Sequence, residues 1–144
     1  MYFFEGQQAS ITREVTAADV ETFAGVSGDN NPVHLDHEFA AKSRFKRRIA
    51  HGILGASYIS AVLGSKLPGP GTIYLSQSIT FKAPVYIGDM VTATVTVLNF
   101  RPDKHILTLR TECTNQDGVV VLEGQAVCLT SDVVSTSEPA EAAS

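Results

Sequence analysis

The sequence predicts an α+β fold in which a curved antiparallel sheet wraps around one long central helix. Residues 51–67, HGILGASYISAVLGSKL, place apolar side chains nearly all round a helical wheel, as is typical of a buried helix. This stretch is short and polar for a membrane span, which needs about 20 apolar residues. The second half of the chain has the pattern of strands with one buried face, and a helix on a concave sheet satisfies both elements. A single layer leaves edges and one face uncovered, so we expect a homodimer.

Size and charge narrow the class of protein. The chain has 144 residues and a formal net charge of −4. Its length suits one domain, placed at residues 1–130, whereas residues 131–144 are rich in Ser, Thr, Glu, Pro and Ala and predict a disordered tail. The negative charge argues against a nucleic-acid or membrane partner. The first residues, MYFFEGQQ, lack the basic and apolar regions of a signal peptide, so a cytoplasmic protein is expected.

The first third of the chain predicts an edge strand and two small helices. Residues 8–14 suit a short strand, and Thr16 suits a helix N-cap with Asp19 in the capping-box position. The apolar spacing carries this helix to about Val26, and the turn formers that follow cannot continue it. Asp36 caps a second predicted helix, which covers residues 37–42.

Four strands are predicted beyond the long helix because apolar and polar residues alternate there. Their ranges are 73–83, 90–97, 106–114 and 119–129. If Asp117-Gly118 is a two-residue hairpin turn, directly opposed residue numbers sum to 235, so Cys113 faces Leu122 and Cys128 faces Leu107. The two cysteines are then not disulfide partners, and we expect both to be buried core thiols.

The segment SGDNNPVH carries the clearest chemical signal. Asp29 and His34 lie five positions apart across an Asn-Pro turn, so both side chains can converge if the loop folds back. A carboxylate and an imidazole that share a water are the minimum for proton transfer in both directions, and Asn31 could orient the water or a substrate carbonyl. Spacing alone leaves two alternatives, a simple turn and a metal cluster that includes Asp36 and His37. No HExxH or paired-cysteine spacing supports the metal, and none is predicted.

Three motifs that follow one another along the chain strengthen the catalytic hypothesis. D-x-N-P-x-H at residues 29–34, A-H-G-x-L at 50–54 and Y-L-x-Q-x-x-x-F-x-x-P-V-x-x-G-D at 74–89 resemble the MaoC-like hydratases, and are most similar to the (R)-specific enoyl-CoA hydratases. The likeness spans roughly residues 10–130. It implies the hot-dog fold, a homodimer, an acyl-CoA substrate, no metal or organic cofactor, and the addition of water to a trans-2-enoyl-CoA.

The resemblance also implies roles for individual residues. Asp29 and His34 would be the catalytic pair and Asn31 the helper, while Gly52 would supply the backbone N–H that holds the thioester oxygen. Ser60 resembles a residue that supports the site. His51 and His105 are given structural roles only. The physical chemistry agrees for Gly52, because a helix N-terminus offers unpaired N–H groups and the positive end of a dipole.

The basic run KSRFKRR places five cations within seven residues, 42–48. A nucleic-acid patch is disfavoured on an acidic protein. Two interpretations stay open: a solvated loop, or contact between Lys46, Arg47 and Arg48 and the phosphates of coenzyme A. The alternatives to a hydratase are an acyl-CoA thioesterase and a non-catalytic acyl-thioester-binding dimer. A thioesterase is disfavoured because hot-dog thioesterases typically place an acidic residue on the central helix, and this helix has none. A binding dimer is disfavoured because it would not need the set of Asp29, Asn31 and His34.

Overall fold

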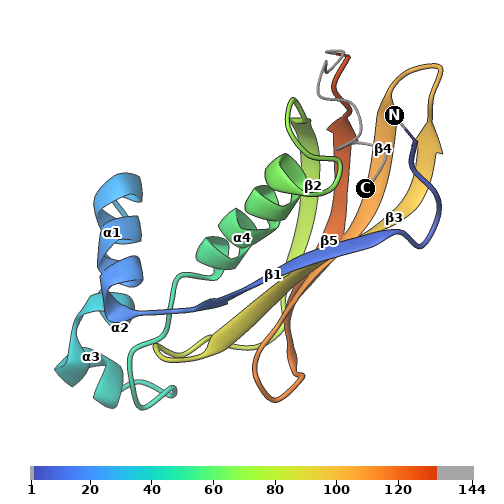
Figure 1. Ribbon diagram of the computed structural model, residues 1–144. Coiled ribbons are helices and arrows are strands. Elements are labelled where there is room, and N and C mark those ends of the chain that lie inside the picture. The colour runs from blue at the N-terminus through green and yellow to red at the C-terminus, as the bar shows by residue number, and fades with distance from the viewer. Residues whose placement is uncertain (1, 133–144) are drawn as a thin grey trace.

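The computed structural model describes residues 2–132 and shows a five-stranded antiparallel sheet curved around one long helix (Figure 1). Along the chain the elements are β1 (Gln8–Glu14), α1 (Ala17–Ser27), α2 (Pro32–Leu35), α3 (His37–Ala41), α4 (Gly52–Ser65), β2 (Ile73–Phe81), β3 (Met90–Arg101), β4 (Ile106–Thr114) and β5 (Val120–Leu129). The strand order is β1-β3-β4-β5-β2, so β1 and β2 are the two edges. The α+β prediction is confirmed. The predicted tail, apart from its first two residues, lies outside the described part of the chain.

The register between β4 and β5 agrees with the pairing predicted from the hairpin. Cys113 pairs with Leu122 and Leu107 pairs with Cys128, as the sum of 235 requires, and both thiols are buried and free. The turn itself is longer than the predicted two residues. A register shift after Cys113 pairs Thr114 with Val120, and the N–H and C=O groups of residues 115–119 close the loop among themselves. The bulge absorbs the extra residues, so the facing of the strands is unchanged.

Helix α4 lies across the concave face of the sheet (Figure 1). Its buried side chains are Leu54, Tyr58, Ile59, Val62 and Leu63. They meet the inward row of β3, where Val91, Ala93, Val95 and Val97 are buried and the threonines between them are not. The prediction of a helix buried all round is wrong for the single chain, because Ile53 is 48% exposed. One sheet covers only one side of a helix. Among the described residues, no helix is long and apolar enough to cross a membrane.

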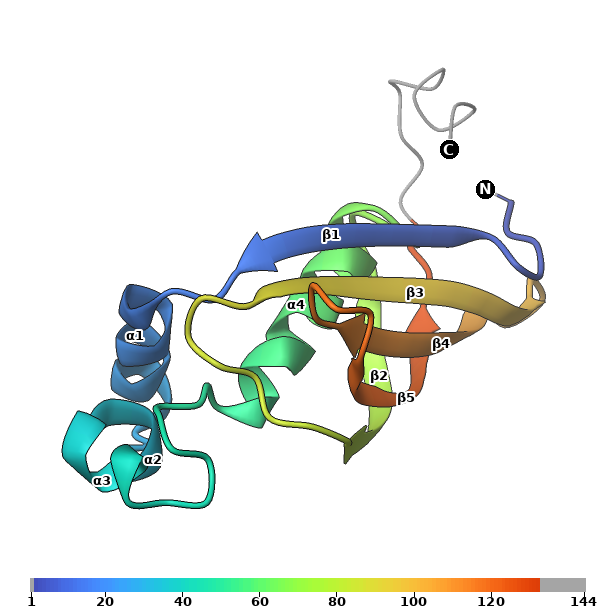
Figure 2. The same cartoon turned by 90° about the horizontal axis from the view of Figure 1, so that it is seen from below.

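The three short helices lie beyond one end of the sheet (Figure 2). The capping box of α1 is confirmed, since the Asp19 N–H donates to Thr16 Oγ1 at 3.1 Å and the Thr16 N–H donates to Asp19 Oδ2 at 3.1 Å. Asp36 caps α3 as predicted. Helix α2 was not predicted. It fits between the two because Pro32 occupies its first position, where a missing N–H costs nothing.

Gly124 is the glycine on which the pairing of β2 with β5 depends. A Cβ at this position would lie 1.8 Å from the carbonyl oxygen of Ser78 on the neighbouring strand. Gly124→Ala should therefore push β2 away and lower the free energy of unfolding by about 3 kcal/mol or more. Gly25→Ala in α1 is the matched control, since its Cβ would meet nothing within 4 Å, and it should stabilise the chain by about 0.5–1 kcal/mol. Urea unfolding of both variants measures the difference, and equal midpoints would contradict the assigned contact.

Candidate active site

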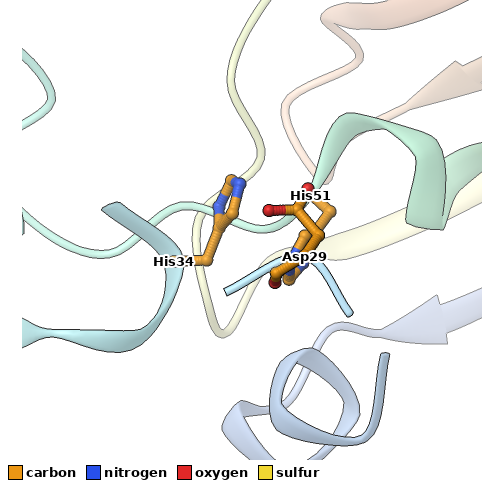
Figure 3. Close-up of side chains that lie close together, drawn as sticks. All are labelled: Asp29, His34 and His51. Atoms are coloured by element: carbon orange, nitrogen blue, oxygen red, sulfur yellow. The ribbon is translucent and has the colours of Figure 1, made fainter. Parts of the chain in front are cut away.

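A cavity of about 530 Å³ opens beside the first turn of α4. Its polar wall contains Asp29, His34 and His51, and the rest is mainly apolar. Figure 3 shows these three side chains converging from the loop after α1, from α2 and from the residue that precedes α4. One ligand-type atom from each lies within 4.8 Å of the others. The structure thus brings the predicted Asp29 and His34 together and adds a third residue.

The loop that carries Asp29 is shaped by its own backbone. Gly28 ends α1 with φ 82°, a left-handed conformation that glycine adopts at little cost, and its N–H donates to Ala24 O at 2.8 Å. The Asp29 Oδ1 atom accepts the Asn31 N–H at 3.2 Å. The Asn31 Oδ1 atom accepts the Val33 N–H at 3.1 Å, which caps α2. In this structure the Asn31 side chain therefore fixes the turn between the two candidate catalytic residues.

His34 is held in one tautomer. The ring is 8% exposed, and its Nδ1 lies 2.7 Å from the carbonyl oxygen of Ile49. A carbonyl oxygen only accepts, so Nδ1 must carry the proton and Nε2 keeps its lone pair. Arg48 supports the same residue from behind, where its Nε donates to His34 O at 2.7 Å. The arrangement leaves His34 able to take a proton at Nε2.

Burial lowers the pKa of His34 below its ordinary value of 6.5. The bond to Ile49 O opposes this shift in the pKa, the neighbouring His51 adds to it, and Asp29 opposes it more weakly. The desolvation of the charged form is the largest of these effects. The imidazole is consequently neutral at neutral pH, which is the state that a proton acceptor needs.

His51 is the member of the cluster that sequence reasoning missed. Its ring stacks on His34 with centroids 3.9 Å apart, and its Nε2 donates to the backbone oxygen of Asp29 at 3.1 Å. The centre of the Phe23 ring lies 4.9 Å from the centre of the His51 ring. A structural role was expected for His51. These contacts describe it, because His51 joins the Asp29 loop to His34. Its position directly before Gly52, inside the A-H-G motif, was the available signal.

The cluster is the set of described residues that could hold a metal ion. Asp36 does not belong to it, because its Oδ1 accepts the N–H groups of Glu38 and Phe39. The two imidazole rings are tilted by 31° with centroids 3.9 Å apart, and the Nδ1 of His34 and the Nε2 of His51 each face a backbone carbonyl. Each ring is left with one nitrogen for a ligand or a proton.

Gly52 opens α4 directly beside the cluster. Among the described residues its N–H has no acceptor, as expected for the first position of a helix, and His51 provides no side-chain cap. Its φ is not positive. An added Cβ would lie 2.8 Å from the Phe81 ring, so glycine keeps this wall of the cavity open. An unpaired N–H at the positive end of a helix dipole suits an oxygen that gains negative charge.

The remaining candidates lie at different distances from the cavity. Ser60 is exposed on α4 and is not part of the cavity wall. The basic segment 42–48 contributes Phe45 to the cavity wall. Arg47 stacks over the Tyr86 ring at 3.9 Å. Arg48 is 7% exposed and lies 3.6 Å from Glu21, so its guanidinium is engaged within the fold and not presented to solvent.

A curved sheet around a central helix, with an acid and a histidine at the start of that helix, defines a hot-dog protein with a candidate proton-transfer site. Comparison with known proteins identifies the class more closely. The family model of the MaoC like domain matches residues 5–117. The chain therefore belongs to the MaoC-like domain family, as its motifs predicted.

Relatives of known name match over most of the chain. It is 54% identical over 125 residues to an (R)-specific enoyl-CoA hydratase of Rhodospirillum rubrum, covering 87% of this chain and 86% of the relative. It is 50% identical to the enzyme of the same name from Aeromonas caviae, over 85% of this chain and 91% of the relative. The solved structure of the A. caviae (R)-hydratase involved in PHA biosynthesis matches with a TM-score of 0.87 and 48% identity, covering 89% of this chain and 97% of that one.

The lowered pKa of His34 predicts a pH dependence of stability. Below pH 6.5 the unfolded chain binds a proton at this residue more readily than the folded chain does, so the free energy of unfolding falls as the pH drops. His34→Ala removes this contribution. Urea unfolding at about pH 7.5 and about pH 5.5 should show a larger loss of stability for the wild type than for the variant. Equal losses would contradict the assigned direction of the pKa shift.

Proposed function

We propose that this chain catalyses the (R)-specific hydration of trans-2-enoyl-CoA to (R)-3-hydroxyacyl-CoA. The observation that carries the proposal is the meeting of Asp29 and a neutral His34 beside the unpaired N–H of Gly52. The relatives of 54% and 50% identity that bear the name of this activity support it. The A. caviae structure is named as that of an (R)-hydratase involved in PHA biosynthesis, and supply of polyhydroxyalkanoate precursors is one use proposed for the product here.

The mechanism follows from where charge develops. As water adds at Cβ of the enoyl thioester, negative charge grows on the carbonyl oxygen, and the N–H of Gly52 together with the α4 dipole would stabilise it. Asp29 and His34 would hold the water between them. The resting Nε2 of His34 has a lone pair and no proton. With Asp29 as a carboxylate, the proton that reaches Cα must therefore come from the water itself, taken up by the pair and passed on, while hydroxide bonds to Cβ.

Two alternative functions make different demands on the site. A thioesterase would place an acid on the central helix, and α4 contains none. A non-catalytic acyl-thioester-binding dimer would not need a neutral imidazole beside a carboxylate at the start of that helix. A carrier protein is the second candidate for the acyl carrier, since relatives at 36% identity are named 3-hydroxyacyl-[acyl-carrier-protein] dehydratases.

A homodimer forms part of the proposal. Edge strand β2 carries Ile73, Leu75 and Phe81, which are 51–55% exposed, and Ile53 is exposed on the free face of α4. An unpaired strand edge with apolar side chains can pair with another chain. A second copy would extend the sheet through β2 and cover α4. The cytoplasmic location and the absence of a nucleic-acid partner stay predictions.

The basic segment is proposed to meet the phosphates of the carrier. Lys46 and Arg47 directly follow Phe45, which lines the cavity, and their charges suit the nucleotide of coenzyme A. Arg48 is not proposed to contact the phosphates, because its Nε donates to the backbone oxygen of His34. The supporting role of Ser60 requires the partner copy, since its own chain leaves it exposed.

The decisive experiment follows crotonyl-CoA with purified protein, measuring the loss of the conjugated enoyl absorbance and the fate of the thioester. Asp29→Asn and His34→Ala should each reduce kcat by about 10²–10⁴, the usual loss for one member of a proton-transfer pair. Asp36→Asn is the matched control, because this carboxylate caps α3 and lies outside the cluster, and it should keep most activity. Release of free coenzyme A would indicate a thioesterase. Near wild-type kcat in either cluster variant would refute the pair.

Gly52 allows a test of its N–H alone. Gly52→Ala and Gly52→Pro both add a Cβ against Phe81, but only proline removes the N–H. Proline suits the position, since it is the first helical residue and His51 before it has φ −61° and ψ 130°. The kcat of Gly52→Pro should fall about 10²–10³ below that of Gly52→Ala. Phe81→Leu in both backgrounds relieves the shared clash. Equal kcat values in folded proteins would refute the oxyanion assignment.

A further inference from the structure

The loop of residues 28–31, which carries Asp29, is shaped mainly by hydrogen bonds to its near neighbours. The Asp29 N–H donates to Ser27 Oγ at 3.1 Å, and the Asp29 carboxylate accepts the Asn31 N–H at 3.2 Å. These partners lie two positions away, so they form the turn without fixing where it lies in the fold. Among the described residues, the one hydrogen bond that joins this loop to a distant part of the chain runs from His51 Nε2 to the Asp29 backbone oxygen, at 3.1 Å.

His34 is fixed to the same segment of the chain through other contacts. Its Nδ1 donates to the Ile49 oxygen at 2.7 Å, and its backbone oxygen accepts the Arg48 Nε at 2.7 Å. The segment directly before α4 thus holds both members of the candidate pair, because Arg48 and Ile49 hold the histidine and His51 holds the loop of the carboxylate. The distance between the Asp29 carboxylate and the His34 ring therefore depends on the side chain of His51.

The His51 side chain is itself firmly held. It is 3% exposed, its ring lies against the His34 ring with centroids 3.9 Å apart, and the centre of the Phe23 ring lies 4.9 Å away. Its backbone oxygen accepts the Leu54 N–H at 3.0 Å in the first turn of α4. A side chain ordered by packing has already lost its rotamer freedom, so its hydrogen bond to the loop carries little further entropic cost.

From this geometry we propose that His51 is a positioning residue for hydration: the N–H at its Nε2 holds the Asp29 loop so that the carboxylate faces His34. The inference rests on the proposed function, because it takes Asp29 and His34 to share the water that is added. Misplacing a reacting group by about 1 Å can lower the rate about 10²-fold. His51 itself transfers no proton in this scheme, and its Nε2 is engaged by the Asp29 carbonyl.

The test compares side chains at position 51 that differ in their N–H. His51→Gln keeps an N–H donor, whereas His51→Met has a similar length and no donor. His51 has φ −61° and ψ 130°, which both replacements adopt without strain, so the N–H of Gly52 is presented alike. With crotonyl-CoA, His51→Met should lower kcat by about 10²-fold with little change in KM, and His51→Gln should recover most of that loss.

Val62→Ala is the stability control, because Val62 is 0% exposed on α4 and lies outside the cavity. It should lower the free energy of unfolding and keep kcat near the wild-type value. Equal kcat values for His51→Gln and His51→Met, or a loss of kcat in Val62→Ala as large as that in His51→Met, would overturn the proposal. Should His51→Met fail to fold, His51→Phe keeps a flat ring against His34 and removes the donor, and its kcat is read in the same way.

Hydrogen exchange separates this inference from the proposed function, because it needs no substrate. The amides of residues 29–31 should exchange faster in His51→Met than in the wild type or in His51→Gln, since the loop loses its long-range hydrogen bond. If no enoyl-CoA is hydrated while this difference is seen, the hydratase proposal fails and the role of His51 in placing the loop stands. If hydration is seen and His51→Met keeps the wild-type kcat, the positioning role fails alone.

Discussion

The burial of one face of α4 on the concave sheet is the constraint on which the other features depend. Leu54, Ile59, Val62 and Leu63 are at most 8% exposed, and they occupy the space that the curvature of the sheet encloses. A flat sheet would leave these side chains exposed, and a helix without this stripe would leave the inward rows of β3 and β4 without cover. The contact fixes the axis of the helix and, with it, the point in space where its first N–H is presented.

The same contact determines where the site can form. The chain reaches α4 through residues 49 and 50, which are tied to the segment after β2: Ile49 forms a bridge with Tyr86, and the Ala50 N–H donates to Val85 O at 2.7 Å. The carbonyl oxygen of Ile49 accepts the hydrogen bond from His34 Nδ1. The tautomer of the candidate catalytic histidine is thus set by the backbone that anchors the helix, so helix position and proton position are coupled.

Sequence patterns were enough for the features that depend on local chemistry. The capping box at Thr16, the alternation along β3 and the facing of Cys113 and Leu122 all followed from residue type and spacing. The one-sided burial of α4 did not, because a wheel of apolar residues does not distinguish burial by its own sheet from burial by a partner. Asp29 and His34 were found by motif, but their approach depends on the left-handed Gly28 and on the Asn31 cap.

His51 shows why the rest of the cluster could not be deduced. Its importance depends on two contacts with residues 17 and 22 positions away, the His34 ring and the Asp29 carbonyl. Neither contact follows from periodicity. The Nε2 of His51 is used in the second contact, and among the described residues its Nδ1 is buried without a hydrogen-bond partner. Two backbone carbonyls, of Ile49 and of Asp29, therefore hold the orientation of the two rings.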